Sequence, residues 1–372
     1  MLLRPGVVIS VLALGAALAG CGDGSSDPEP SGSPSTPVSS AATTATSPTA
    51  PATEPTAAGG RIALLVPGPP TMRSEAFDRS TFADAVAERC PDCTVDFYDA
   101  QGDDTRQTEQ LQAAVDAGAQ VVVLDAVEPL SVVNGVAAAQ ERGVKVVGYD
   151  TLLDGLDSYV AYDRDQVGEE QARALLRAMR GPGNVVMVNG SPVDGGAAQV
   201  KTAAHQVLDG GDATVVGEFD ADPSTPRATR KWLSTIFTFF PPDTLAGVYA
   251  ADDAVAGEVV QALPEDADLP VTGAGATLPG VRRLVSGRQL MTVYRPVEPA
   301  ADTTARVAVA ALGGGDPGEP TTTTDGVPTY LLDPVPITVD DVEDTVVADG
   351  FWTVREICRP RLRADCRKAG LL

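Results

Sequence analysis

Short apolar runs alternate with longer helix-patterned segments along most of this chain, beginning at Arg61. The runs are rich in β-branched residues, whereas the longer segments, such as 74–89, 105–117, 130–142 and 166–180, repeat apolar residues at helical spacing. Runs without polar alternation are typical of parallel strands that helices cover on both faces. The pattern predicts an α/β, doubly wound fold with strands at 62–66, 95–98, 121–124, 144–149, 159–162, 185–188, 215–219, 248–250, 271–273 and 290–294.

The number of predicted strands indicates two sheets. About ten strands before residue 297 are more than one open twisted sheet of this kind usually carries. The roughly 310 residues of the folded part also suit two domains of about 150 residues each. A natural division falls near residues 162–165, where a predicted strand leads through Asp163 into a helix.

The first 21 residues have the pattern of a secretory signal. Arg4 precedes an apolar run over residues 7–18, which is too short to span a bilayer permanently. The sequence Leu-Ala-Gly-Cys at 18–21 resembles a bacterial lipobox and predicts lipidation of Cys21. We therefore expect a protein anchored by lipid to the extracytoplasmic face of the cell membrane, with an ordinary secreted protein as the alternative.

Residues 22–59 contain almost only Ser, Thr, Pro, Ala, Gly and acidic residues, with no aromatic side chain to bury. This composition predicts a disordered tether. Its length gives an average reach of roughly 30–37 Å, so a folded body can move above the membrane.

Acidic residues outnumber basic residues, 51 to 27, and the net charge is −24. Such a charge argues against nucleic acid and against an anionic membrane surface as partners, since both need clustered cations. The C-terminal residues 352–372 are an exception because they are basic. This tail is interpreted either as a clamp onto the protein's own acidic lobe or as a contact for membrane lipid.

Four cysteines remain besides Cys21, and their use agrees with export. Their proximity in sequence favours disulfides between Cys90 and Cys93 and between Cys358 and Cys366. The alternatives are a zinc site shared by the two pairs, which we do not expect, or a redox pair at Cys90 and Cys93.

Carboxylates dominate the positions that directly follow the predicted strands, where ligands of open parallel sheets bind. Aspartates there can accept hydrogen bonds from several hydroxyl groups, and Arg295 can donate, which suits neutral polyols such as sugars. The alternative is that these aspartates are ordinary turn and N-cap residues. The positions include Asp99, Asp125, Asp150, Asp163, Asp220, Asp252, Asp253 and Arg295.

Six blocks in order resemble the type I periplasmic sugar-binding proteins, and most closely the D-xylose-binding proteins. They are GYD at 148–150, YDRDQVGE at 162–169, GSPVD at 190–194, ADDA at 251–254, MTVYRP at 291–296 and DTVVADGF at 344–351. The resemblance implies two Rossmann-like lobes joined by a hinge of three crossovers near Tyr162, Pro296 and Asp333. It places residues 60–163 and 297–330 in an N-terminal lobe and residues 164–296 and 331–351 in a C-terminal lobe.

The resemblance also implies a function: a solute-binding lipoprotein that closes on a sugar-like ligand and delivers it to an ABC permease. Asp150, Asp163, Asp253 and Arg295 fall where the family has polar ligand contacts. Arg164 is a further ligand candidate that could pair with Asp163 or face an acidic group of the ligand. Two further ligand candidates are Phe77 and Asp220. Phe77 lies near the loop after the first predicted strand, and Asp220 lies in a segment that in the family often supplies a tryptophan for stacking on the sugar ring.

We expect no enzyme. The sequence has no nucleophile elbow and no phosphate-binding glycine-rich loop with lysine, and the single histidine, His205, sits in a helical pattern as a surface residue. No cofactor, no nucleic acid and a monomeric state are expected. The alternative function is a ligand-sensing or partner-binding lipoprotein of the same fold that feeds a signalling receptor.

Overall fold

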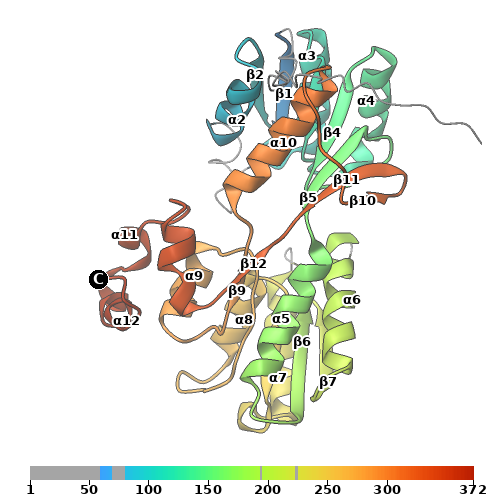
Figure 1. Cartoon of the computed structure of the whole chain (residues 1–372). Coiled ribbons are helices and arrows are strands. Elements are labelled where there is room, and N and C mark those ends of the chain that lie inside the picture. The colour runs from blue at the N-terminus through green and yellow to red at the C-terminus, as the bar shows by residue number, and fades with distance from the viewer. Residues whose placement is uncertain (1–58, 69–79, 193–194, 223–224) are drawn as a thin grey trace, which may run out of the picture. The chain divides into compact units, whose positions relative to one another are not determined.

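The computed structural model describes residues 59–68, 80–192, 195–222 and 225–372 (Figure 1). All of them belong to one compact unit, Thr53–Leu372. Cys21, the tether and Phe77 lie outside the described residues. Within the described residues, no helix is both long and apolar enough to cross a membrane.

The first sheet has seven strands in the order β10-β11-β5-β4-β3-β1-β2, and only the β10-β11 pair is antiparallel. Ile62 and Leu64 face α2 and α10, whereas Ala63 and Leu65 face α3 and α4, so alternate side chains of β1 feed two separate cores. The strands are β1 (Arg61–Val66), β2 (Thr94–Asp99), β3 (Val121–Leu124), β4 (Lys145–Tyr149), β5 (Ser158–Tyr162), β10 (Thr322–Thr324) and β11 (Val327–Leu332). The covering helices are α2 (Phe82–Arg89), α3 (Asp104–Asp116), α4 (Pro129–Glu141) and α10 (Val297–Ala311).

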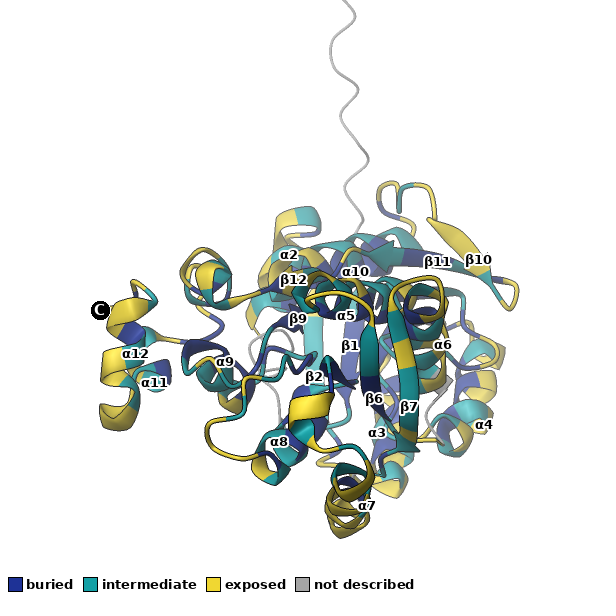
Figure 2. Ribbon diagram, turned by 90° about the horizontal axis from the view of Figure 1, so that it is seen from below, coloured by how far each residue is buried: buried dark blue, intermediate teal, exposed yellow. Residues whose placement is uncertain are grey.

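The second sheet has three parallel strands in the order β7-β6-β8. Val185 and Met187 of β6 pack against α5 and α6, and Val186 and Val188 pack against α7 and α8. The strands are β6 (Gly183–Asn189), β7 (Ala213–Asp220) and β8 (Gly247–Ala250), and the helices are α5 (Arg164–Ala178), α6 (Gly195–Asp209), α7 (Pro226–Phe239) and α8 (Asp253–Ala262), with the short turn η2 (Pro242–Thr244). The strands β1, β3, β4, β6 and β8 are largely buried on both faces, whereas the edge strand β10 is exposed (Figure 2). The predicted α/β, doubly wound class is confirmed. Besides the two main sheets, β9 (Thr292–Tyr294) and β12 (Val335–Ile337) form a two-stranded sheet.

The chain passes between the two sheets three times. β5 leads into α5, β9 (Thr292–Tyr294) leads into α10, and β11 leads into β12 (Val335–Ile337), which pairs antiparallel with β9. The three passages are hydrogen-bonded to one another. Asp163 N donates to Leu332 O at 2.9 Å, and Gln166 Nε2 donates to Asp333 Oδ1 at 2.9 Å. The Tyr162 hydroxyl donates to the carbonyl of Pro296.

The predicted strand at 271–273 forms only a single bridge, from Val271 to Val248. The side chain of Thr272 takes over the next hydrogen bonds: its Oγ1 accepts from Ala250 N at 2.8 Å and donates to Ala250 O at 3.0 Å. Two backbone bonds form at Val248, from its N to Pro270 O at 2.9 Å and from Thr272 N to its O at 3.2 Å, and the Thr272 hydroxyl takes the place of the next ones. The apolar runs did not predict β10, β11 and β12. β10 and β12 have only three residues each, and β11 carries Pro328 and Thr329 among its apolar residues.

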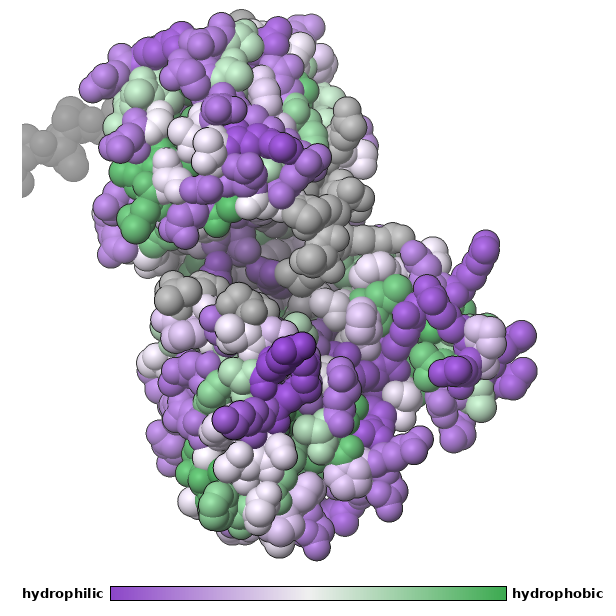
Figure 3. Space-filling model, turned by 180° about the vertical axis from the view of Figure 1, so that it is seen from behind, coloured by the Kyte–Doolittle hydropathy of each residue, from purple (hydrophilic) through white to green (hydrophobic). Residues whose placement is uncertain are grey.

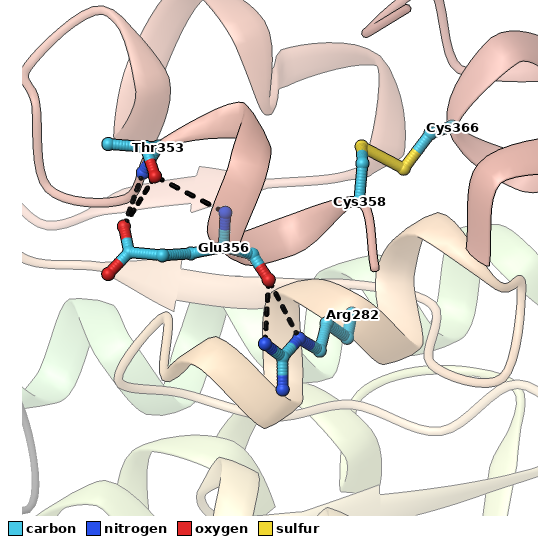
Figure 4. The surroundings of a disulfide bond; sticks show 5 residues. All are labelled: Arg282, Thr353, Glu356, Cys358 and Cys366. Carbon is cyan, nitrogen blue, oxygen red and sulfur yellow. Dashed lines mark hydrogen bonds between the residues drawn. A yellow bond between two sulfur atoms is a disulfide. The ribbon is translucent and has the colours of Figure 1, made fainter. Parts of the chain in front are cut away.

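The C-terminal residues share an apolar core with α9 (Leu278–Val285). Figure 4 shows Arg282 of α9 beside Glu356 and the nearby disulfide. Trp352 Nε1 donates to Ala276 O at 2.7 Å, and Arg282 Nη2 donates to Glu356 O at 2.6 Å. Thr353 and Glu356 cap the next helix reciprocally. The elements are η3 (Val339–Asp341), η4 (Glu343–Val347), α11 (Val354–Ile357), η5 (Pro360–Leu362) and α12 (Arg363–Lys368).

Both predicted disulfides are present, Cys90–Cys93 and Cys358–Cys366. Their thiols are therefore unavailable as zinc ligands. The second bond joins the end of α11 to α12 and closes a covalent loop from Cys358 to Cys366.

We predict that Cys358→Ala with Cys366→Ala loosens the C-terminal residues. Because the bond closes a loop of about nine residues, its loss should lower the local free energy of opening by about 2–3 kcal/mol. Hydrogen exchange of residues 354–368 should rise while that of the first sheet stays unchanged. The double variant Cys90→Ala with Cys93→Ala is the control and should leave exchange at 354–368 as it was; equal exchange in all three proteins would contradict the prediction.

Candidate functional site

The predicted site residues lie where strands end. Asp150 directly follows β4, Asp163 follows β5, Arg295 follows β9, and Asp220 is the last residue of β7. Ligands of open parallel sheets bind outside these carboxyl ends. The contacts that these four side chains make within the protein determine which of them are available to a ligand.

Asp150 is the centre of a charged cluster at the passages between the sheets. Its carboxylate accepts hydrogen bonds from Arg295 Nη1 at 3.1 and 3.2 Å, and Arg164 Nη2 lies 3.5 Å from Asp150 Oδ1. Arg164 Nη2 also donates to the backbone carbonyl of Asp150 at 2.7 Å. The backbone φ of Asp150 is +55°, a left-handed conformation that aspartate adopts more readily than most residues. Two predicted ligand residues, Arg164 and Arg295, thus converge on a third.

The cluster is balanced in charge. Burial raises the pKa of Asp150, but the charges of Arg295 and Arg164 outweigh it and hold the pKa below its usual value. Asp150 in turn raises the pKa of Arg295, with a smaller contribution from Asp125. The side chains of Asp150, Arg164 and Arg295 remain 29%, 25% and 32% exposed, so a small ligand can reach them.

Three tyrosines surround this cluster. Tyr159 and Tyr162 are buried, and Tyr159 Oη donates to Asp150 O at 2.9 Å. Burial raises the pKa of Tyr159 to about 12 and also raises that of Tyr162. Tyr149 is only half-buried and therefore has the more accessible ring for stacking on a ligand. A fourth aromatic, Phe219, is stacked on Trp232 with ring centroids 5.2 Å apart.

Arg164 connects the cluster to the second sheet's helices. A Cβ atom at Gly196, in the first turn of α6, would lie 1.9 Å from Arg164 Nη1, so a larger residue there would displace the end of the Arg164 side chain. The expected pairing of Arg164 with Asp163 is wrong. Arg164 pairs with Asp150 instead, because Asp163 uses its carboxylate on its own helix.

Asp163 is the N-cap residue of α5. Its Oδ1 accepts from the backbone N–H groups of Asp165 and Gln166 at 2.9 and 3.2 Å, and Oδ2 accepts from Gln166 Nε2 at 3.2 Å. This is the capping role that the sequence left open as an alternative. Through Gln166, the cap also holds Asp333 of the third passage.

Asp253 is 2% exposed and its carboxylate is fully engaged. Oδ1 accepts from Gln289 Nε2 at 2.7 Å and Thr292 Oγ1 at 2.9 Å, and Oδ2 accepts from Thr277 N at 2.7 Å and Thr277 Oγ1 at 3.0 Å. Burial raises the pKa of Asp253. Asp253 thus joins the start of α8 to the loop before α9 and to β9, and its contact with a ligand stays a prediction. The half-buried Asp252 beside it caps α8 by accepting from Val255 N at 2.7 Å.

Asp220 belongs to a second polar group at the edge of the second sheet. Its Oδ1 accepts from Lys201 Nζ at 2.8 Å and Asn189 Nδ2 at 2.9 Å, and the Lys201 contact lowers the pKa of Asp220. Lys201 Nζ also lies 2.7 Å from Glu218 Oε1, and His205 Nε2 lies 3.3 Å from the same oxygen. His205 is thus half-buried against β7.

Sequence reasoning missed Lys201 and Asn189. The signal for Lys201 was its spacing of four residues from His205 on one helix face, opposite Glu218 and Asp220, which point to one face of β7. Asn189 is 2% exposed, and within the described residues its Oδ1 has no hydrogen-bond partner. A buried amide oxygen without a partner is costly.

We predict that Asp253→Asn destabilises the unliganded protein by about 1–3 kcal/mol, because the amide places a donor against the donors of Gln289 or Thr277. Urea denaturation of the ligand-free protein measures it. The neighbouring variant Asp252→Asn is the control, since asparagine caps helices as well as aspartate. An unchanged urea midpoint for Asp253→Asn would contradict the structural role.

A family model and individual relatives both identify this chain as similar to periplasmic binding proteins. Residues 69–316 match the model of the periplasmic binding protein domain. The chain is 32% identical over 270 residues to the D-xylose-binding periplasmic protein of Escherichia coli, covering 69% of this chain and 81% of that protein.

Solved structures agree on the fold. A solute-binding protein of an ABC transporter from Clostridium phytofermentans with bound β-D-glucose superposes with a TM-score of 0.68 at 22% identity, covering 80% of this chain and 99% of that one. One from Bacillus halodurans with bound myo-inositol has a TM-score of 0.63 at 18% identity, covering 79% and 98%. These relatives are binding proteins, as predicted for this chain, and not enzymes. The chain belongs to the periplasmic binding protein family and has its type I fold.

Proposed function

We propose that this protein binds a neutral monosaccharide or a related polyol at Asp150, Arg164 and Arg295 and delivers it to an ABC permease. The observation that carries the proposal is the position of Asp150 between two arginines, with all three side chains partly exposed at the passages between the sheets.

Hydroxyl chemistry fits this cluster. A sugar hydroxyl both donates and accepts, so it can donate to a carboxylate while a guanidinium donates to it. The contacts within the protein leave donors on Arg164 and Arg295 and accepting capacity on Asp150 for a ligand. Because Asp125 adds a second carboxylate near Arg295, two arginines face two carboxylates, and the cluster favours no net charge on the ligand. D-xylose, β-D-glucose and myo-inositol, in the names of the related proteins, are all neutral polyhydroxy compounds.

The cluster also links binding to a change between lobes. Asp150 follows a strand of the first sheet, whereas Arg164 begins a helix of the second and reaches α6. A ligand that contacts both would favour the conformation in which they are close. In this proposal Asp220, Lys201 and Asn189, whose Oδ1 has no hydrogen-bond partner within the described residues, form the second wall of the site. Phe77 remains a proposed stacking residue.

We further propose that Cys21 carries the lipid anchor and that residues 22–59 tether the body to the extracytoplasmic face of the membrane. The lipobox-like sequence before Cys21 supports the anchor, and the lack of aromatic residues supports the tether.

We predict that a neutral sugar or polyol raises the melting temperature of the purified protein. At about 100 times the Kd, binding to the native state adds about 2.7 kcal/mol of stability. Asp150→Asn should remove most of this rise, because it keeps the shape and the tolerance of positive φ but loses the charge that holds both arginines. Thermal melts with pentoses, hexoses, polyols and amino acids provide the measurement.

The matched control for this prediction is Asp116→Asn, which breaks a surface pair with Arg142 in the same lobe. This variant should keep the full ligand shift. If no compound in the panel shifts the wild-type melt and no small molecule is released from the purified protein, the ligand proposal is wrong; an equal shift in Asp150→Asn would reject the cluster as the site.

We predict that Cys21→Ala releases the protein from the membrane or leaves its precursor unprocessed, while the folded body keeps its melting temperature. Membrane fractionation and the mass of the mature chain provide the measurement. The control is the double variant Cys358→Ala with Cys366→Ala, which should stay membrane-bound. Normal processing and retention of Cys21→Ala on the membrane would rule out the lipid anchor.

A further inference from the structure

The C-terminal residues 352–372, here called the C-terminal extension, have a charge opposite to that of the rest of the protein. They contain six Arg and Lys against two acidic residues, a net side-chain charge of +4, so the remaining chain carries −28. Because opposite charges on one chain attract, such a tail could neutralise acidic residues of its own lobe. The side-chain contacts decide whether it does.

The structure shows that the extension is held by apolar packing and not by its charges. Ile357, Cys366 and Leu371 are buried in the core on α9, and Trp352 donates to Ala276 O. The cationic side chains are all exposed, and Figure 2 shows α12 largely in the exposed colour. Among the described residues, the one ion pair of this surface joins Lys368 to Asp365, at 3.6 Å. The other cations form no ion pair within the described part of the chain; they are Arg355, Arg359, Arg361, Arg363 and Arg367.

The backbone that carries these arginines is held in place, although no ion pair among the described residues neutralises their charges. The disulfide Cys358–Cys366, the cap of Thr353 and Glu356, and the bond from Arg282 to Glu356 O hold the backbone that carries them (Figure 4). Burial lowers the pKa of Arg282, and the charge of Arg359 lowers it further, so like charges stand together here. Figure 3 shows hydrophilic side chains gathered on the outer side of this part of the molecule. A preorganised cationic surface binds an anion with little loss of conformational entropy.

We propose that the C-terminal extension is a docking surface for the anionic phospholipid headgroups of the membrane to which the protein is attached. This proposal rests on the lipid anchor proposed above. The anchor and a tether with a reach of roughly 30–37 Å keep headgroups near the body at all times.

Charge then selects the face that meets the membrane. The chain outside the extension, with −28, is repelled by an anionic bilayer, whereas the cationic extension is attracted, within a Debye length of about 8–10 Å. Clusters of about 4–8 Lys and Arg are typical of phospholipid-binding surfaces, and guanidinium groups bind phosphate oxygens in pairs. The extension would thus turn α9, on which it packs, toward the membrane.

The test uses the full lipidated chain carrying Trp232→Phe, which leaves Trp352 at the base of the extension as the only tryptophan. The protein is reconstituted into vesicles that contain a dansyl-labelled lipid, either with phosphatidylcholine alone or with 30% phosphatidylglycerol. Energy transfer from Trp352 to the dansyl group reports how close the extension lies to the surface. We expect at least twofold more transfer with the anionic lipid at low salt, and loss of this excess in 0.5 M NaCl.

Two triple variants with the same total charge separate a local from a general effect. Arg361→Gln, Arg363→Gln and Arg367→Gln should remove at least half of the excess transfer. Arg177→Gln, Arg227→Gln and Lys231→Gln, which neutralise exposed cations of α5 and α7, should leave it unchanged.

Three results would overturn the proposal: equal transfer with both lipids, an equal loss in both triple variants, or a normal anionic excess in the extension variant. If equal transfer with both lipids is accompanied by loss of permease-dependent uptake in the extension variant, the surface binds an acidic protein instead. A drop in molecular mass of the extension variant on light scattering would assign the surface to the acidic body of a second copy. A missing lipid anchor gives a different result from a missing docking surface. Without the anchor, the protein would not float with either kind of vesicle in a density gradient.

Discussion

The attraction between Asp150 and two arginines organises the region on which the rest of this protein depends. Asp150 stands at the end of β4, Arg295 at the passage from β9 into α10, and Arg164 at the passage from β5 into α5. Half-buried charges of this kind are costly to separate, because each one left alone keeps its desolvation penalty. The same three side chains that tie the passages together are therefore those with donors and acceptors left over for a ligand.

The surrounding hydrogen bonds make these passages one unit. The cap of Asp163 positions Gln166, which holds Asp333 of the third passage, and Tyr162 holds Pro296 of the second. A displacement of one segment therefore strains the others. This coupling gives a physical reason why a ligand that changes the contacts of Asp150 can change the relation of the two lobes.

Much of the fold was predictable because parallel strands that are covered on both faces appear in the sequence as short, continuous apolar runs. The run at 271–273 forms only a bridge because the hydroxyl of Thr272 binds Ala250 where the backbone ladder would continue, and the spacing of apolar residues does not show this. The site was predictable to the level of position but not of role. All the aspartates after strands look alike in sequence, and only the fold shows that Asp163 caps a helix, that Asp253 is buried among four donors, and that Asp150 meets two arginines. Lys201 and Asn189 escaped because their partners on β7 are distant in sequence.

In the C-terminal extension, the residues that attach it to the protein differ from the residues that carry its charge. Its apolar residues, its disulfide and its cap account for its attachment to α9, and none of these interactions involves its exposed arginines. Had those arginines served stability, ion pairs with the acidic body would be the expected outcome, since acidic residues are abundant there. Surface ion pairs contribute only about 0–1 kcal/mol each, and these arginines form none with the acidic residues that the structure describes. An anionic partner outside the chain explains this face without assigning it any part in the fold.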